Sequence, residues 1–328
     1  MSATYRVVAT DRVSKKGLAP LRDDERFEVV RIKSSTEARF GSELETAAGL
    51  IVRSATTVDA RLLEAAPELK VVGRAGVGVD NIDVAAASER GVAVVNAPGG
   101  NTVSAAELTM ALLLSVARRV SEADRSMREG RWDRANLQGV ELRGRTLGVV
   151  GAGRIGSAVA DRCRAFGMRV IVHDPYLSAD RLAELRSVVV EMDQLVAEAD
   201  VITLHVPLTD ETRGLIGESA LLKMKKGAFL VNLSRGGVVD EAALARALIE
   251  GRIAGAGLDV YETEPLAPES PLLSAPNLVL TPHLGASTKE AQVQVALEVA
   301  ANLRAALAFG DLTHAINAAE IARAAGLS

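Results

Sequence analysis

The chain has 328 residues, of which 48% are hydrophobic and 24% are charged, and its formal net charge at pH 7 is −4. The length is too great for one ordinary domain, and the apolar content is sufficient for two cores. The slight negative charge and the 3% aromatic content argue against a nucleic-acid or membrane surface, since such surfaces need basic patches or stacking side chains.

No segment indicates export or membrane insertion. The N-terminal residues run directly into a predicted strand, without an apolar signal region. The apolar run Ala105–Ala117 contains Glu107, Thr109 and Ser115, and it is too short to span a bilayer. The single cysteine, Cys163, cannot form an internal disulfide. We therefore expect a soluble cytoplasmic protein, and no residue pattern predicts a metal site.

The first 97 residues alternate short apolar runs with helical patterns. This alternation predicts a parallel sheet that is covered by helices on both faces. No G-x-G-x-x-G pattern occurs in this part, so we expect a separate α/β unit with functional loops at the carboxyl ends of its strands. Its predicted strands are Tyr5–Ala9, Phe27–Ile32, Gly49–Arg53, Lys70–Gly73 and Val92–Asn96.

A boundary is predicted after the last of these strands. The segment Asn96–Gly100 contains Pro98 and two glycines, which is typical of a hinge or a domain boundary. A long helical pattern follows, from about Val103 to Gly130. Its middle, Leu108–Val116, is apolar nearly all round, so we expect burial between domains or against another subunit.

The most informative stretch lies near the middle of the chain. It begins with an apolar run fit for a buried strand, Thr146–Val150. The pattern G-x-G-x-x-G follows, with glycines at Gly151, Gly153 and Gly156, and helical spacing then covers Ile155–Phe166. The first glycine permits a tight turn, the second lets the backbone approach a pyrophosphate, and the third lets the helix pack on the strand. The helix N-terminus adds free N–H groups, so the stretch predicts a dinucleotide-binding unit.

An acidic residue stands where such a unit needs one. A second apolar run, Arg169–Val172, ends at His173 and Asp174, and Asp174 lies 174 − 151 = 23 residues after Gly151. A carboxylate at this point accepts hydrogen bonds from the adenosine ribose of NAD and repels the 2′-phosphate of NADP. We therefore expect NAD as the cofactor.

Further apolar runs and a last helical pattern complete the chain. Together with the first part they predict an α/β protein with two doubly wound parallel-sheet domains. The runs are Val201–Leu204, Ala228–Asn232, Gly255–Asp259 and Leu278–Thr281, and the helical pattern covers Thr288–Phe309.

Three candidate catalytic side chains each follow a predicted strand: Arg235, Glu264 and His283. Ligands bind at the carboxyl ends of the strands in a doubly wound sheet. When an alcohol is oxidised by hydride transfer, a histidine can take the hydroxyl proton, a carboxylate can hold the ring, and an arginine can bind a substrate carboxylate. Taken singly, each residue has a more common structural explanation, and only their joint appearance favours a site. His205 is a weaker candidate that could line the cofactor cleft.

Three motifs carry a resemblance to a known family. Asn232–Glu241, Gly257–Leu266 and Thr281–Thr288 closely resemble the signatures of the D-isomer-specific 2-hydroxyacid dehydrogenases, and the resemblance extends over about residues 5–317. It implies that Arg235 binds the substrate carboxylate, that Glu264 tunes the histidine, and that His283 is the general acid/base. With the glycine pattern, it gives as NAD contacts Gly151, Gly153, Arg154, Ile155, Gly156, Asp174, His205, Val206, Pro207, Ser234, Asp259, His283 and Gly285.

The resemblance also implies how the domains and subunits are organised. A Rossmann NAD-binding domain, residues 98–286, is expected to be inserted into a flavodoxin-like substrate domain formed by residues 1–97 and 287–328. A homodimer is expected to form through the long helix near residues 103–130.

Within the family, the segments Val52–Val58, Gly73–Asn81 and Asn101–Glu107 resemble the branch that oxidises 3-phospho-D-glycerate to 3-phosphooxypyruvate, the first step of phosphorylated L-serine biosynthesis. Arg53 and Arg74 are predicted near strand ends and could supply the cations that a substrate phosphate needs. The segment around Arg134 resembles one that reaches the neighbouring subunit's site. The expected substrate contacts are Arg53, Ser54, Arg74, Ala75, Gly76, Arg134, Arg235 and His283.

Two alternatives stay open. The chain stops soon after Asn317, as in short relatives that act on unphosphorylated substrates, so a general D-2-hydroxyacid dehydrogenase or a glyoxylate or hydroxypyruvate reductase is the enzyme alternative. For the same reason, serine feedback through a C-terminal regulatory domain is not expected. The other alternative is an NAD(H)-sensing binding protein, because corepressors related to this family keep its fold and its catalytic residues.

Overall fold

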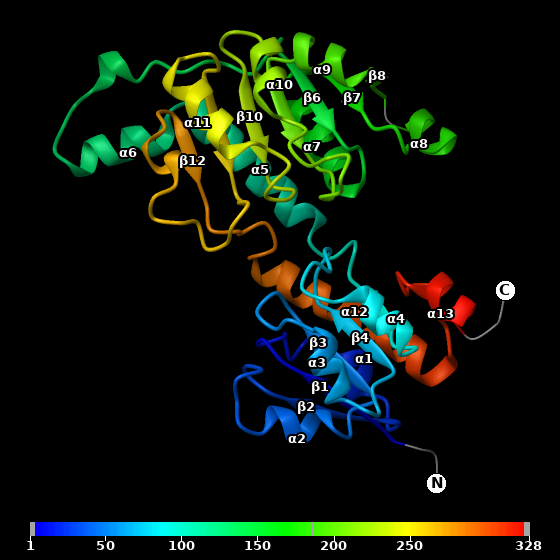
Figure 1. The fold of residues 1–328 in the computed structure, drawn as a ribbon. Coiled ribbons are helices and arrows are strands. Elements are labelled where there is room, and N and C mark those ends of the chain that lie inside the picture. The colour runs from blue at the N-terminus through cyan, green and yellow to red at the C-terminus, as the bar shows by residue number, and fades with distance from the viewer. Residues whose placement is uncertain (1–3, 185, 325–328) are drawn as a thin grey trace. The chain divides into compact units, whose positions relative to one another are not determined.

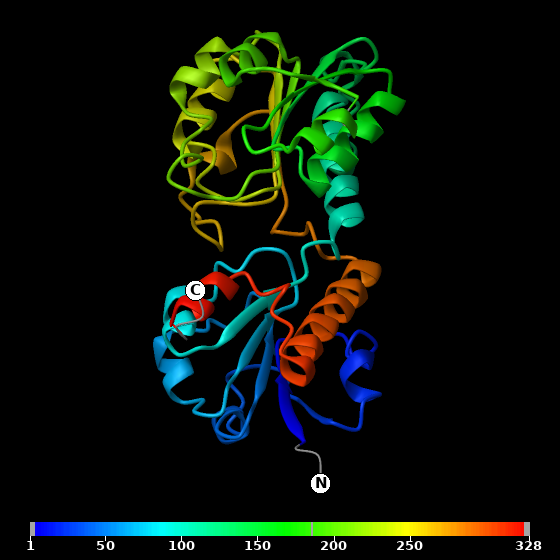
Figure 2. The ribbon, with the colours of Figure 1, turned by 90° about the vertical axis from the view of Figure 1, so that its right-hand side faces the viewer.

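The computed structural model describes residues 4–184 and 186–324, which form two compact units. The first unit comprises the residues up to Asn101 and those from Ala286 onward, and the second comprises Thr102–Gly285. Each contains a parallel sheet with helices on both faces (Figure 1, Figure 2). The first boundary lies after residue 101, which is 101 − 97 = 4 residues later than expected from the sequence. The second lies after residue 285, which is 286 − 285 = 1 residue earlier than expected.

The sheet of the first unit has the strand order β2-β1-β3-β4-β5, and all neighbouring strands are parallel. This is the flavodoxin-like order, in which the switch point lies between β1 and β3. All five predicted strands are confirmed, with ends that differ by at most one residue. They are β1 (Tyr5–Ala9), β2 (Phe27–Arg31), β3 (Gly49–Val52), β4 (Val71–Arg74) and β5 (Ala93–Asn96).

Helices cover both faces of this sheet because successive side chains of a strand point to opposite faces. Val7 packs into a core with α1 and α12, whereas Val8 packs into a core with α2, α3 and α4 (Figure 2). The helices are α1 (Ala19–Arg22), α2 (Phe40–Leu44), α3 (Ala60–Glu64), α4 (Val84–Glu89), α12 (Lys289–Phe309) and α13 (Ala318–Ala324).

Polar side chains fasten the returning C-terminal segment to this unit. The helix predicted over Thr288–Phe309 is confirmed, and Thr288 caps it by accepting the N–H of Ala291. Asn317 is buried, and its Oδ1 accepts the N–H of Val94 at 2.8 Å, while its amide donates to the carbonyl of Val92 at 3.0 Å. Because Val94 lies in β5, this one amide joins the end of the chain to the edge of the sheet.

The sheet of the second unit has the order β12-β11-β10-β9-β6-β7-β8, again with parallel neighbours. The order reverses between β6 and β9, as in a Rossmann domain. The six strands expected here are confirmed, and the short edge strand β8 was not expected. They are β6 (Thr146–Val150), β7 (Arg169–His173), β8 (Val188–Val189), β9 (Val201–Leu204), β10 (Phe229–Asn232), β11 (Gly255–Leu258) and β12 (Leu278–Leu280).

Two layers of helices bury this sheet. α5 and α7 lie on one face, and α9, α10 and α11 lie on the other (Figure 2). None of the helices in the described residues is long and apolar enough to cross a membrane. The helices are α5 (Thr102–Ala117), α6 (Val120–Arg128), α7 (Arg154–Ala165), α8 (Ala179–Glu184), α9 (Met192–Glu198), α10 (Glu218–Lys223), α11 (Glu241–Ile249) and the 3-10 helices η1 (Arg134–Asn136) and η2 (Pro271–Ser274).

The single long helix predicted over residues 103–130 is wrong, because the structure divides it into α5 and α6. Arg119, which has a left-handed φ of 53°, separates the two helices. The apolar middle of α5 packs on the sheet of its own unit, with Leu112 against Gly257 of β11. The burial of α5 therefore needs no second subunit, and α6 is a polar helix with only Ser126 buried.

Candidate active site

The three glycines of the G-x-G-x-x-G pattern have different surroundings. Gly151 has φ +86°, and a Cβ there would lie 2.6 Å from the carbonyl oxygen of His205. A Cβ on Gly156 would lie 2.0 Å from the carbonyl oxygen of Gly151. A Cβ on Gly153 would meet no atom within 4 Å. The fold therefore requires the first and third glycines, whereas the second leaves open space beside the start of α7.

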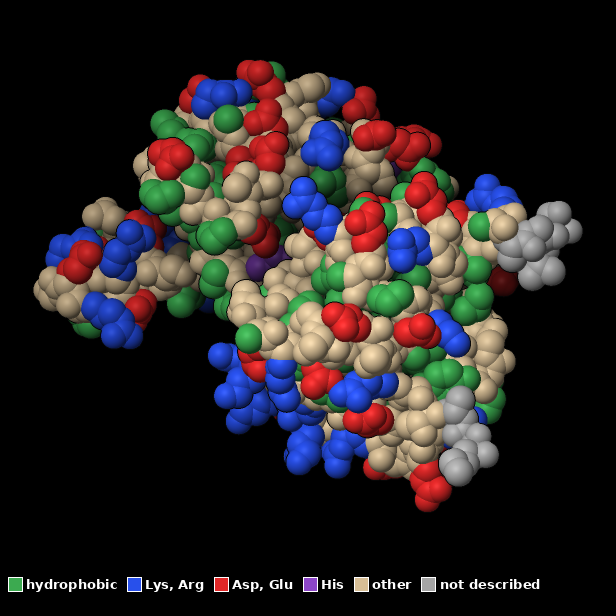
Figure 3. Space-filling model, turned by 60° about the horizontal axis from the view of Figure 1, so that its bottom comes forward, with side chains coloured by type: hydrophobic (Ala, Val, Ile, Leu, Met, Phe, Trp, Pro, Cys, Tyr) green, Lys and Arg blue, Asp and Glu red, His purple; other side chains and the backbone are tan. Residues whose placement is uncertain are grey.

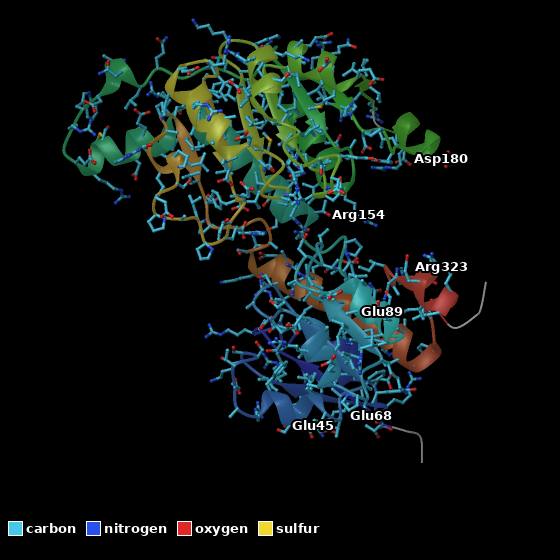
Figure 4. The ribbon with its side chains drawn as sticks, in the orientation of Figure 1. Glu45, Glu68, Glu89, Arg154, Asp180 and Arg323 are labelled. Carbon is cyan, nitrogen blue, oxygen red and sulfur yellow. The ribbon has the colours of Figure 1, made fainter. Side chains whose placement is uncertain are left out.

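Asp174 lies beside this turn. It follows β7, and its Oδ2 accepts the N–H of Ala152 at 2.8 Å while its Oδ1 accepts the N–H of Tyr176 at 3.0 Å. Arg154 begins α7, and its side chain is exposed at the N-terminal end of that helix (Figure 4). An open glycine, a helix N-terminus and an acid at the switch point fit the pyrophosphate and the ribose of NAD.

The segment after β9 lies on the other side of the switch point. The N–H of His205 donates to the carbonyl of Val150, and its Nε2 lies 2.9 Å from Oγ1 of Thr203. Although part of its side chain reaches the surface, desolvation lowers the pKa of His205 to about 3, so the ring is neutral at pH 7. Val206 and Pro207 follow, and Val206 lines the glycine turn at Gly151.

Arg235 is carried by a tight turn at the end of β10. The side chain of Asn232 holds this turn, because its amide donates to the carbonyl of Arg235 and its Oδ1 accepts both the N–H and the hydroxyl of Ser234. A Cβ on Gly236 would lie 1.7 Å from the carbonyl oxygen of Tyr261, so only glycine fits there. The turn therefore fixes the backbone from which the half-buried Arg235 side chain extends.

Glu264 and His283 form a hydrogen-bonded pair. Oε2 of Glu264 lies 2.7 Å from Nδ1 of His283, and Oε1 of Glu264 accepts the N–H of Tyr261 at 3.1 Å. Glu264 follows β11 and His283 follows β12, while Arg235 follows the adjacent β10. Because these strands are parallel neighbours, the structure places the three residues at the same edge of one sheet. About half of the His283 side chain is exposed, which leaves it accessible to a substrate.

Asp259 organises the loop that carries His283. Its side chain is fully buried, and it accepts the hydroxyl of Thr281 at 2.6 Å and the N–H groups of Leu284 and Gly285 at 2.7 and 2.8 Å. The carboxylate therefore holds this loop, and its expected contact with NAD stays a prediction. The roles of Asn232, Tyr261 and Thr281 were missed, because polar residues at strand ends have no distinctive spacing.

The two candidate phosphate-binding arginines belong to the first unit. Arg53 follows β3 at the switch point, and its N–H donates to Oδ2 of Asp11 at 2.9 Å. Burial lowers the pKa of the half-buried Arg53 guanidinium, and Asp11 partly opposes this shift. Asp11 also accepts the N–H and the hydroxyl of Thr56, so one buried carboxylate fixes the loop that includes the exposed Ser54.

Arg74 is the last residue of β4. A Cβ on Gly76 would lie 1.4 Å from Nη1 of Arg74, so the guanidinium folds over the Gly76 backbone. Ala75 is buried, and its N–H donates to the carbonyl of Val52. Arg134 lies instead in the second unit, at the exposed start of η1.

Metal ligands show no comparable grouping. Within residues 4–184 and 186–324, no group of three or more His, Cys, Asp or Glu side chains is arranged to hold a metal ion. Cys163 is buried in α7, and desolvation raises the pKa of its thiol to about 12, which makes it an unreactive packed side chain.

Comparison with known proteins agrees with this architecture. Residues 110–285 match the family model described as the NAD binding domain of D-isomer specific 2-hydroxyacid dehydrogenases. The chain is 53% identical over 254 residues to the D-3-phosphoglycerate dehydrogenase of Archaeoglobus fulgidus, which covers 77% of this chain and 48% of that protein. The chain spans about half the length of the curated relatives that it matches.

Two solved structures match over nearly their whole length. The TT0316 protein of Thermus thermophilus is 41% identical, with a TM-score of 0.84 over 95% of this chain and 99% of that chain. The NADPH-dependent glyoxylate/hydroxypyruvate reductase of Sinorhizobium meliloti is 33% identical, with a TM-score of 0.82 over 97% and 98%. With more than half of its residues matched by the family model and its whole fold shared with these structures, the chain belongs to the D-isomer-specific 2-hydroxyacid dehydrogenase family.

Proposed function

We propose that this protein is an NAD-dependent dehydrogenase that oxidises 3-phospho-D-glycerate to 3-phosphooxypyruvate. The observation that carries the chemistry is the 2.7 Å hydrogen bond between Glu264 and His283 at the strand ends of an NAD-binding domain. The choice of substrate is supported by relatives named D-3-phosphoglycerate dehydrogenase, with which about half of the aligned residues are identical. One of them, from Bacillus subtilis, is 48% identical over 90% of this chain.

His283 acts as the general base in this proposal. Its Nδ1 is engaged by the Glu264 carboxylate, so Nδ1 carries the proton and Nε2 is left to take the proton of the substrate hydroxyl. The glycine turn and Asp174 would hold NAD⁺, which would supply the hydride acceptor for C2 of the substrate. Glu264 stabilises the imidazolium that forms, and the N–H of Tyr261 keeps its carboxylate in place. The products are the 2-keto acid, NADH and the proton held by His283.

Arginines divide the recognition of the substrate. We assign the substrate carboxylate to Arg235, because a guanidinium can form two parallel hydrogen bonds to it and polarise the adjacent carbonyl. We assign the phosphate to Arg53 and Arg74, which lie at the carboxyl ends of β3 and β4 in the first unit, where ligands bind in such sheets. The lowered pKa of Arg53 reflects an incompletely solvated cation, which gains from a bound dianion.

The cofactor preference follows from the carboxylate beside the glycine turn. Asp174 is expected to bind the ribose hydroxyls of NAD and to repel the 2′-phosphate of NADP. A higher kcat/KM with NADPH than with NADH would contradict this assignment.

The proposal includes a homodimer in the cytoplasm. α6 and the segment that follows it extend away from the sheet of their unit (Figure 1) and expose Val120, Met127 and Trp132, the last with 78% of its surface accessible. Exposed apolar side chains of this kind mark interfaces. Arg134 lies on the same segment, and we propose that it reaches the site of the second subunit. Light scattering on the wild type and on Trp132→Asp tests this, and a monomeric wild type would contradict it.

One observation favours a second candidate, a reductase of unphosphorylated 2-keto acids. The chain covers 98% of a glyoxylate/hydroxypyruvate reductase with a TM-score of 0.82. A substrate panel on the purified protein separates the two activities. We expect kcat/KM for 3-phospho-D-glycerate to exceed that for D-glycerate or D-lactate by at least about 100-fold, because two arginine–phosphate contacts are worth several kcal/mol.

Variants of the two arginines make the panel decisive. Arg53→Gln and Arg74→Gln should raise KM for 3-phospho-D-glycerate while leaving KM for D-lactate unchanged. If neither variant alters the preferred substrate, the phosphate assignment is wrong. If glyoxylate or hydroxypyruvate is reduced far more efficiently than 3-phosphooxypyruvate, the second candidate replaces the first.

A further inference from the structure

A second basic site lies at the carboxyl ends of β1 and β2 in the first unit. A cavity of about 790 Å³ opens there, within the range of small-molecule sites. Lys and Arg side chains gather on one face of this unit (Figure 3). The cavity is lined by Arg12, Arg31, Ile32, Lys33, Glu37 and Arg39, which the dehydrogenase chemistry does not use.

The lining carries four cations and one carboxylate. Glu37 is already engaged, because its two oxygens accept the N–H of Lys33 at 2.7 Å and Nε of Arg39 at 3.4 Å. In the part of the chain that the structure describes, no carboxylate lies within 4.0 Å of Arg12, Arg31 or the Lys33 ammonium. Like charges around one concavity repel each other, so the arrangement gains from a bound anion.

Two of the arginines are held in place before any ligand arrives. Nη2 of Arg39 donates to the carbonyl of Arg31 at 2.7 Å, and Nη2 of Arg31 donates to the carbonyl of Val13 at 3.2 Å. Both guanidinium groups therefore lose little freedom on binding, which favours affinity.

The loop after β1 contributes to both this site and the loop that carries Arg53. Asp11 and Arg12 both have left-handed φ values, of 56° and 55°. The buried Asp11 carboxylate binds the Arg53 loop, whereas the exposed Arg12 lines the cavity. The two neighbouring residues therefore serve two different strand ends.

We propose that this cavity binds a diphosphate group. Arginine forks match phosphate oxygens in pairs, and a diphosphate carries enough charge to neutralise most of the four cations. Among the described residues, Ile32 is the single apolar residue of the lining and no aromatic side chain lines the cavity, so no described side chain can stack on a nucleoside base there. Inorganic diphosphate and the diphosphate group of a larger ester are the two possible sources.

Calorimetric titration with inorganic diphosphate tests the site, with NADH saturating so that the nucleotide site is closed to the probe. Arg12→Ala and Lys33→Ala should each weaken binding about fivefold or more, and the double variant about 30-fold or more, because charge-assisted hydrogen bonds are lost. Both positions are exposed, so the variants should keep the wild-type melting temperature. Lys70→Ala is the matched control, since Lys70 is an exposed cation at the opposite, amino end of β4, and it should bind like the wild type.

Other probes and one further variant define what would overturn the site. ADP should bind within a few-fold of diphosphate, which would show that the diphosphate group alone is read, and citrate should bind at least tenfold more weakly. Equal binding of citrate, or no diphosphate binding below about 1 mM, overturns the proposal. Loss of binding in Arg53→Gln with full binding in the Arg12/Lys33 double variant also overturns it, because the anion would then occupy the substrate arginines. None of these results depends on dehydrogenase activity.

Discussion

The sharpest test of the cofactor site is the substitution Gly153→Ala. A Cβ at this position meets no protein atom within 4 Å, and φ is −65°, which alanine adopts without strain. Gly153 is the N-cap of α7, where alanine is less favourable than glycine, so the substitution should cost up to about 1 kcal/mol of stability. If the pyrophosphate of NAD lies against this backbone, the new methyl group displaces it from a charge-assisted N–H contact. Such a contact is worth about 2 kcal/mol, which corresponds to about 30-fold in the dissociation constant of NADH.

The assay combines an unfolding titration with a fluorescence titration of NADH. Gly153→Ala should stay folded, with a free energy of unfolding within about 1 kcal/mol of the wild type, and bind NADH about 30-fold more weakly. Gly156→Ala is the matched control, because a Cβ there would lie 2.0 Å from the carbonyl oxygen of Gly151 and should destabilise the fold by about 1–3 kcal/mol or more. A folded Gly153→Ala variant with wild-type NADH affinity would refute the placement of the dinucleotide at this turn.

Three further predictions concern the loops that carry the chemistry. His283→Ala should lower kcat by about 10²–10⁴, the usual contribution of a general acid/base, and steady-state kinetics that showed less than a tenfold loss would contradict its role. Asp259→Asn turns an amide N–H₂ toward one of the three converging donors, so denaturant titration should show a free energy of unfolding about 3 kcal/mol lower than that of the wild type. Unchanged stability would show that the loop does not depend on the carboxylate. The pKa of His205 is lowered from 6.5 to about 3, so below pH 6.5 the unfolded chain binds a proton that the folded chain does not. The free energy of unfolding should therefore be highest above pH 6.5 and should fall by about 2 kcal/mol between pH 7.5 and pH 5. His205→Gln should remove this part of the pH dependence, and an unchanged slope would exclude His205 as its source.

Sequence patterns predicted an element correctly where the interactions that form it lie within one short segment. The buried strand Thr146–Val150 and the helix over Thr288–Phe309 were predicted because apolar runs and helical spacing depend on residues a few positions apart. The glycine pattern also belongs to this class, since the left-handed turn at Gly151 and the close approach of Gly156 to Gly151 involve neighbouring residues. The long helix failed because a left-handed Arg119 has no marker in the sequence.

Contacts between distant residues needed the tertiary structure. The sequence by itself determined two α/β units, an NAD-type fingerprint and three candidate catalytic residues at strand ends. Only the folded chain decided that Glu264 reaches Nδ1 of His283, that a buried Asp259 holds the His283 loop, and that four cations converge at the ends of β1 and β2. The physical reason is that strand order and register bring side chains from separate loops to one edge of a sheet. Neither the strand order nor the register can be predicted from the residue spacing within a single segment.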